Sequence, residues 1–236
     1  GPKFGSGLDS VVTVQGDKVP YRAYPNNIRD FYKTGTIVQN GVSIASGTPD
    51  NNISLGVSST IQKGIIPFSE YKRHSIQVGG NKKLQNGLKI GTSITYVRSG
   101  QGGTPMGNGG SAFGQLTRIP RSYDLMGMEY KDLKDINQKS FFYNPAQNHP
   151  MWSAEKEQLT SNVDRLFGYF TMGYDITKWL NVSYRATADV YSDRRKLILQ
   201  IGSAREAAGQ VTEDQFVRSE LNGDLMIRAN KEDIFT

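Results

Sequence analysis

The chain has 236 residues, no cysteine and a formal net charge of +6. Its length fits one or two domains of ordinary size, the lack of cysteine excludes disulfide and thiolate sites, and no apolar run approaches the roughly 18 residues that a membrane-spanning helix requires. The basic residues are scattered along the chain, whereas nucleic-acid binders gather them on one face. We therefore expect no nucleic-acid partner.

Residues 1–35 are expected to form a turn-rich lead-in with one short helix. A Pro-Asn-Asn start favours a helix, because an asparagine side chain accepts hydrogen bonds from the free amides of a first turn. Ile28, Phe31 and Tyr32 follow at helical spacing, and Gly35 is a natural stop. Such a helix would cap the end of a barrel or a sandwich.

The next stretch, residues 36–67, reads as a hairpin with two different faces. Val38, Val42 and Ile44 share one face of its first strand, because successive side chains leave a strand on opposite sides. The second strand repeats the alternation with Ile53, Leu55, Val57 and Ile61. The opposite face holds small uncharged groups. The pattern suits a wall between two different solvents.

Seven strands are predicted from this alternation of apolar and polar side chains. They lie near residues 36–46, 53–62, 72–80, 88–98, 164–175, 180–191 and 216–229. In the sixth strand one face has no charge, while the other carries Arg185 and Asp189, which require water or partners because an unpaired charge is costly in an apolar medium. The polar face of the seventh strand carries Arg218, Glu220, Asp224 and Arg228.

The connections alternate in length. Short turns are predicted at 47–52, 81–87, 175–179 and 230–234, and longer connections at 62–71, 99–163 and 192–215. In an up-and-down meander all short turns then fall at one end, as in outer-membrane barrels with strands of about 9 to 11 residues. We predict an all-β fold, an antiparallel transmembrane β-barrel in which the six charged residues face a wet lumen. A soluble β-sandwich that binds glycans is the alternative.

Candidate contact residues lie in the connections expected to be long. Phe113, Tyr123 and Trp152 would either stack on a ligand or a lid partner, or pin the long loop, in which residues 122–126 are expected to form a short helix. Arg194, Arg195 and Lys196, expected at a loop end, would contact lipopolysaccharide phosphates or remain solvated. The glycine-rich segment 100–110 lacks a phosphate-binding motif and is expected to be a flexible loop.

Two strings of residues stand in a specific order and spacing: N-I-R-D-F-Y-K-T-G at 27–35 and Q-K-G-I-I-P at 62–67, with a strand ending S-I-A-S-G at 43–47 between them. In these the chain resembles the SusC/RagA family of TonB-linked, or TonB-dependent, outer-membrane receptors. Segments 1–4 and 174–180 are similar to further parts of that family. The resemblance implies a plugged barrel of about 22 strands, of which residues 36–236 form a partial barrel of about seven.

The resemblance also implies a function and partners. Family members reside in the bacterial outer membrane and import oligosaccharides or peptides with energy delivered through TonB, usually with a SusD-like lipoprotein over the extracellular mouth. Neither a catalytic residue nor a cofactor is implied, because the family imports rather than converts. The plug, its TonB-contacting segment and the remaining strands have no counterpart here, so we expect the chain to be a segment of a longer protein. A structural barrel of a secretion or surface assembly remains an alternative.

Overall fold

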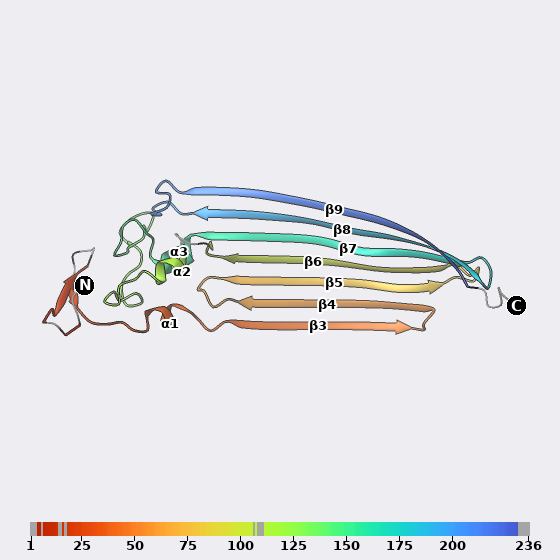
Figure 1. Cartoon of the computed structure of the whole chain (residues 1–236), viewed down its shortest axis with the longest axis horizontal. Coiled ribbons are helices and arrows are strands. Elements are labelled where there is room, and N and C mark those ends of the chain that lie inside the picture. Colours follow the sequence, from red (N-terminus) through yellow and green to blue (C-terminus); the bar gives the residue numbers. More distant parts are fainter. Residues whose placement is uncertain are drawn as a thin grey trace.

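The structure is a computed structural model that describes residues 4–5, 7–13, 16, 18–105, 107 and 111–230. Its main element is one seven-stranded antiparallel sheet in the order β3-β4-β5-β6-β7-β8-β9, in which each strand pairs only with its neighbours along the chain (Figure 1). The strands are β3 (Thr36–Gly47), β4 (Asn51–Lys63), β5 (Glu70–Lys83), β6 (Lys89–Gly103), β7 (Gln158–Asp175), β8 (Leu180–Leu199) and β9 (Gln210–Ala229). The sheet is open, with β3 and β9 at its edges.

The strands are longer than the sequence pattern predicts. They run from 12 residues in β3 to 20 in β8 and β9, because backbone pairing continues beyond the apolar part of each strand. Residues 100–103 of the glycine-rich segment belong to β6, which corrects the flexible-loop prediction there, while residues 106 and 108–110 lie outside the described part. The expected connection at 192–215 shrinks accordingly to 200–209.

The predicted difference between the two ends of the sheet is present. Connections 48–50, 84–88 and 176–179 lie at one end, and 64–69, 104–157 and 200–209 at the other. We call these the turn end and the loop end. The predicted turn at 230–234 falls, apart from its first residue, outside the described residues.

The two faces of the sheet differ in chemistry throughout. On the apolar face one row of cross-strand neighbours reads Val42, Val57, Ile76, Tyr96, Leu166 and Val190. These side chains are open to the surroundings: Val42 is 69% exposed, and Leu221 in the next row of this face is 75% exposed. Among the described residues the only other sheet is the two-stranded β1-β2 pair, so no second sheet packs on this band as a sandwich would require.

The buried apolar core lies beyond the loop end of the sheet (Figure 1). It is built from α1 (Asn27–Phe31), α2 (Ala112–Leu116), α3 (Pro150–Lys156) and the loop around Leu125. The core residues are Phe31, Ala112, Leu116, Leu125 and Ala154. A hairpin of β1 (Ser10–Val12) and β2 (Lys18–Pro20) precedes them. No helix of the described residues is long and apolar enough to cross a membrane.

Local structure corrects three details of the predicted helices. α1 ends at Phe31, earlier than Gly35, and Asn26 makes no side-chain capping hydrogen bond. Residues 122–126 form turns rather than a helix. The loop helices lie elsewhere: α2 starts where Ser111 Oγ accepts a hydrogen bond from the Gly114 N–H (3.1 Å), which satisfies one of the free amides of the first turn.

Candidate functional site: the polar face and the loop cluster

All six charged residues predicted to share the polar face do so. The cross-strand register puts Arg185 opposite Asp224 and Asp189 opposite Glu220. Neighbouring cations offset the like charges of the second pair: Arg165 Nε donates to Asp189 Oδ1 (2.8 Å), and the Arg218 guanidinium pairs with Glu220. The polar face thus presents a surface of alternating charge.

Aromatic rings lie beside two arginines of the polar face, a contact that the sequence analysis did not predict. The Arg165 guanidinium lies 5.0 Å from the Phe167 ring centroid, and that of Arg185 lies 5.9 Å from Tyr169. Such pairs attract because the face of an aromatic ring is electron-rich. The signal was present in the sequence as odd-numbered aromatics in β7, in phase with Arg165. A face of this kind offers both stacking and charged hydrogen bonds to a polar solute.

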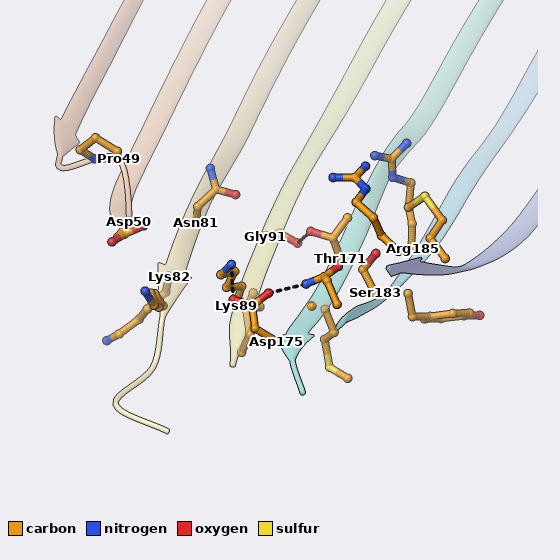
Figure 2. A pocket seen from close by; sticks show the side chains of 18 residues that line it. Pro49, Asp50, Asn81, Lys82, Lys89, Gly91, Thr171, Asp175, Ser183 and Arg185 are labelled. Carbon is orange, nitrogen blue, oxygen red and sulfur yellow. Dashed lines mark hydrogen bonds and ion pairs between the residues drawn. The ribbon is translucent and has the colours of Figure 1, made fainter. Parts of the chain in front are cut away.

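A hollow of about 540 Å³ lies at the turn end, lined mainly by the polar face of β5 to β9 (Figure 2). Lys89 Nζ donates to Asp175 Oδ2 (2.7 Å), and the amide of Asn181 donates to the other oxygen of the same carboxylate (2.6 Å). Thr171 Oγ1 donates to the main-chain oxygen of Gly91 (3.2 Å), and Arg185 extends over the same hollow (Figure 2). The arrangement can hold a polar protein surface or solute.

The loop end carries an aromatic cluster. The ring centroid of Tyr123 lies 5.6 Å from that of Phe142 and 5.5 Å from that of Tyr143, and the His149 ring lies 5.4 Å from Phe142. His149 is fully buried and caps α3: its Nδ1 accepts from the Met151 N–H (3.1 Å), while Nε2 lies 3.2 Å from the Leu125 oxygen. Burial lowers the pKa of His149 to about 4, with the Leu125 bond acting in the opposite direction, so the ring is neutral at pH 7.

A polar cluster around Glu155 attaches α3 to the preceding loop. Tyr130 Oη donates to Glu155 Oε2 (2.7 Å), and Lys131 Nζ donates to both oxygens of that carboxylate (3.0 and 3.2 Å). Burial alone raises the pKa of the Glu155 carboxyl, but these hydrogen bonds and one from Lys156 outweigh it, and the pKa lies below its usual value. Burial and the Glu155 carboxylate raise the pKa of Tyr130 to about 12.

A buried polar network joins the long loop to the β8-β9 connection. All three residues of this network are buried, with at most 2% of their surface exposed: Asn148, Glu157 and Ser203. Asn148 Nδ2 donates to Glu157 Oε1 and to Ser203 Oγ (both 2.9 Å), and Ser203 Oγ donates to the same carboxylate oxygen (2.8 Å). Arg205 NH1 lies 3.9 Å from the other oxygen of Glu157. Residues 111–157 and 200–209 therefore form one packed cluster, which we call the loop cluster.

The three candidate contact residues of the long loop differ in position. Trp152 is fully buried in α3 and donates from Nε1 to the Gln138 oxygen (2.7 Å), which favours the alternative that it pins the loop. Tyr123 is half-buried in the aromatic cluster. Phe113 is 65% exposed on α2. Phe113 is thus the one of these three whose ring is open to a partner or ligand.

The basic group Arg194, Arg195 and Lys196 lies within β8 and not in a loop, which corrects its predicted setting. Successive residues alternate between the faces, so Arg195 lies on the polar face, where its Nε contacts Asp193 Oδ2 (2.7 Å). Arg194 and Lys196 lie on the apolar face beyond its apolar band, paired with Asp164 (3.3 Å) and Glu213 (2.8 Å). The three do not form one site.

Comparisons with known proteins place the fold. A solved structure described as "Structure of the RagAB peptide importer in the 'closed-closed' state" matches with a TM-score of 0.70 over 95% of this chain. The likeness is one of fold. Sequence identity is 14%, and the chain spans 24% of the length of that solved chain. No protein-family model and no curated protein matches the chain. The sheet is therefore an antiparallel β-sheet consistent with a segment of a barrel of the importer's fold.

Among the described residues no group of three or more histidine, aspartate or glutamate side chains is arranged to hold a metal ion. The polar groups of the sheet are joined by hydrogen bonds and charge pairs. This chemistry suits recognition of a polar solute or a protein surface.

Proposed function

We propose that the chain forms part of the wall of an outer-membrane barrel that imports bulky nutrients and does not convert them. The observation that carries the proposal is the band of exposed branched side chains that crosses all seven strands on one face, opposite a charged and aromatic face. A contiguous apolar surface of this extent marks a membrane or a partner. Its alternation with a wet face is the pattern of a barrel wall.

The height of the band supports a membrane setting. In β8 it runs from Leu180 to Val190, which at about 3.3 Å per residue and a tilt of about 40° spans roughly 25 Å. That height matches the apolar band of outer-membrane barrels. The loop end then faces the outside of the cell and the turn end the periplasm.

The cargo we propose is a peptide or an oligosaccharide, moved with energy delivered through TonB to a plug inside the barrel. Likeness of fold to a peptide importer supports the peptide class. The polar face supports both classes, because its charge pairs suit peptide termini and its aromatic rings suit sugars. A SusD-like lipoprotein is the partner proposed at the loop end, where Phe113 is open to contact.

Membrane insertion is tested on the full-length protein extracted from cell envelopes in mild detergent. A closed barrel shifts its migration on gels after boiling and fractionates with the outer membrane. A protein that is soluble without detergent and migrates identically with and without boiling contradicts the barrel.

Import is tested by uptake of labelled peptides and oligosaccharides in cells with and without a functional TonB. Uptake of one class that requires TonB supports the proposal, and copurification of a surface lipoprotein supports the partner. A barrel that copurifies with a different stable assembly and promotes no uptake indicates the structural alternative.

A further inference from the structure

Two arginines converge on one carboxylate on the apolar face, just beyond the apolar band at the loop end. Arg194 NH2 lies 3.3 Å from Asp164 Oδ2, Arg98 Nε lies 3.9 Å from Oδ1, and Tyr96 Oη donates to Oδ1 (2.6 Å). Arg98 and Asp164 are direct cross-strand partners. One carboxylate thus orients two guanidinium groups and leaves an excess positive charge. We call Arg98, Asp164 and Arg194 the arginine pair site.

Both guanidinium groups keep free capacity for a ligand. Their side chains are 69% and 62% exposed, whereas that of Asp164 is only 29% exposed. A guanidinium carries five N–H donors in a planar fork, which suits bidentate binding of a phosphate. Lys72 lies on the same face of β5, where Glu70 neutralises it (2.9 Å), and between it and Arg194 the ladder holds Gly100, which has no side chain, and Asn162. The surface above the arginine pair is therefore sterically open, and its excess positive charge comes from Arg98 and Arg194.

An apolar groove runs down the same face from this site. Its volume is about 650 Å³, and it is floored by the small residues Gly168, Ala186 and Ala188, while the Tyr184 side chain lies over Gly223. Larger apolar side chains wall it, namely Ile94, Leu166, Phe170, Val190 and Leu221. Three small residues on the adjacent strands β7 and β8 produce a depression where the rest of the band carries larger side chains.

The groove and the basic site are continuous. Leu166 in the wall is followed on the same face by Asp164, two residues along β7, and Val190 is followed by Ser192 and then Arg194 along β8. A ligand with an anionic head and a long apolar chain can therefore occupy both at once. Neither part alone specifies such a ligand, but their alignment along one strand direction does.

We propose that this face binds lipopolysaccharide, with a phosphate of its lipid moiety on Arg98 and Arg194 and one acyl chain in the groove. The inference rests on the proposed function, because it takes the loop end to lie in the outer leaflet of an outer membrane, where this phosphorylated glycolipid is the anionic lipid. Asp164 acts as a positioning residue that holds the two guanidinium groups toward the headgroup layer. Basic clusters at a membrane surface attract such head groups electrostatically.

The head contact is tested with the Arg98→Gln/Arg194→Gln double variant of the full-length protein purified from outer membranes in mild detergent. Native mass spectrometry counts lipopolysaccharide retained per protein as purified lipopolysaccharide is titrated. Loss of charge-assisted hydrogen bonds is expected to weaken retention by about tenfold or more. Lys82→Gln, on the same face at the turn end, serves as the matched control and should bind as the wild type does.

The tail contact is tested with Ala188→Trp, which fills the groove, against Val42→Trp, which introduces the same side chain elsewhere on the apolar face. Retention is expected to fall about fivefold or more for Ala188→Trp, since burial of several methylene groups is lost, and to stay unchanged for Val42→Trp. When the lipopolysaccharide is stripped of its phosphates, wild type and the Arg98→Gln/Arg194→Gln variant should retain equal amounts of it.

The outcomes separate this inference from the proposed function. A heat-modifiable outer-membrane protein whose lipopolysaccharide retention is equal in wild type and double variant overturns the lipid site and leaves the barrel intact. Equal competition by phosphatidylglycerol overturns the assignment to lipopolysaccharide. Absence of heat-modifiable migration in the wild type overturns the proposed function itself.

Discussion

Asn27 Nδ2 donates a hydrogen bond of 2.6 Å to the main-chain oxygen of Tyr123, although 96 residues separate them in the chain. The carboxamide oxygen of Asn27 accepts from the Leu125 N–H (3.2 Å), so one side chain satisfies both a donor and an acceptor of the long loop. Phe31, one turn further along α1, is fully buried among α2, α3 and Leu125. The lead-in to the first sheet strand is thereby attached to the loop cluster.

Asn27→Ala should loosen this attachment. Two half-buried main-chain groups lose their partner, and each unsatisfied buried group costs about 1 to 3 kcal/mol. Hydrogen exchange of residues 111–157 in the full-length protein is expected to accelerate, with little change in β4 and β5. Asn26→Ala is the matched control, because the Asn26 side chain makes no capping hydrogen bond. Equal exchange in the two variants would show that the attachment does not depend on Asn27.

Acid should loosen the loop cluster through His149. Its pKa is about 4 in the folded chain against an ordinary value of 6.5. The unfolded loop therefore takes up a proton first as the pH falls, so the contribution of the neutral ring is complete above about pH 6.5 and is lost toward pH 4. The full difference is on the order of 3 kcal/mol. Limited proteolysis of the loop between pH 7.5 and pH 4.5 measures it.

The control for the pH effect keeps a capping side chain at the start of α3 and removes the imidazole that takes up the proton. His149→Asn retains a good helix-capping acceptor and should flatten the pH profile while lowering stability at pH 7.5. His74→Gln, which changes an exposed histidine of β5, should leave the profile unchanged. An unaltered profile in His149→Asn would assign the acid response to other groups.

Ser203→Ala should detach the β8-β9 connection from the long loop. The change removes a hydroxyl that bonds both Asn148 and Glu157 in a fully buried setting. The expected loss is about 1 to 3 kcal/mol, visible as faster hydrogen exchange in residues 200–209. Ser43→Ala, the same substitution on the exposed strand β3, is the control. Retained protection of 200–209 in Ser203→Ala would mean that the remaining contacts, among them the hydrogen bond from the Ala204 N–H to Asn148 Oδ1 (2.7 Å), suffice to hold the connection.

Val42→Arg and Leu55→Arg should each destabilise the folded barrel in lipid vesicles by about 2 to 4 kcal/mol near the midplane of the membrane. Both positions lie on the apolar face and are directly in the exposed band. Ser43→Arg places the same charge on the polar face one residue away and should cost much less. Denaturant unfolding of the full-length protein measures the difference. Tolerance of both apolar-face variants would contradict a lipid-facing band.

Alternation alone was sufficient to predict the two faces and the meander. Arg185 and Asp189 were placed correctly on one face of β8 from the sequence, because successive side chains of a strand leave on opposite sides. The ends of the strands could not be predicted in the same way. Residues 192–199 of β8 fall in the connection predicted at 192–215, yet they pair with β7 and β9, since backbone hydrogen bonds do not require alternating apolar side chains.

The loop cluster lay largely beyond sequence reasoning. Its partners are far apart in the chain: Phe31 shares one buried core with Leu116 and Ala154, and Asn148 donates a hydrogen bond to Ser203. Nothing local to any one of them specifies the contact. One available signal was Pro150, since proline favours the first position of a helix and here follows the cap residue of α3.

The meander has a consequence for the order in which the wall is built. Every strand pairs with its chain neighbour, so most of the sheet can form one hairpin at a time. The β6-β7 junction is the exception, because residues 104–157 must first bring its two strands together, and the entropic cost of closing a connection rises with its length. We expect pulse-labelled hydrogen exchange during refolding to show β3 to β6 and β7 to β9 protected first and Phe31 last, when the two halves are already joined.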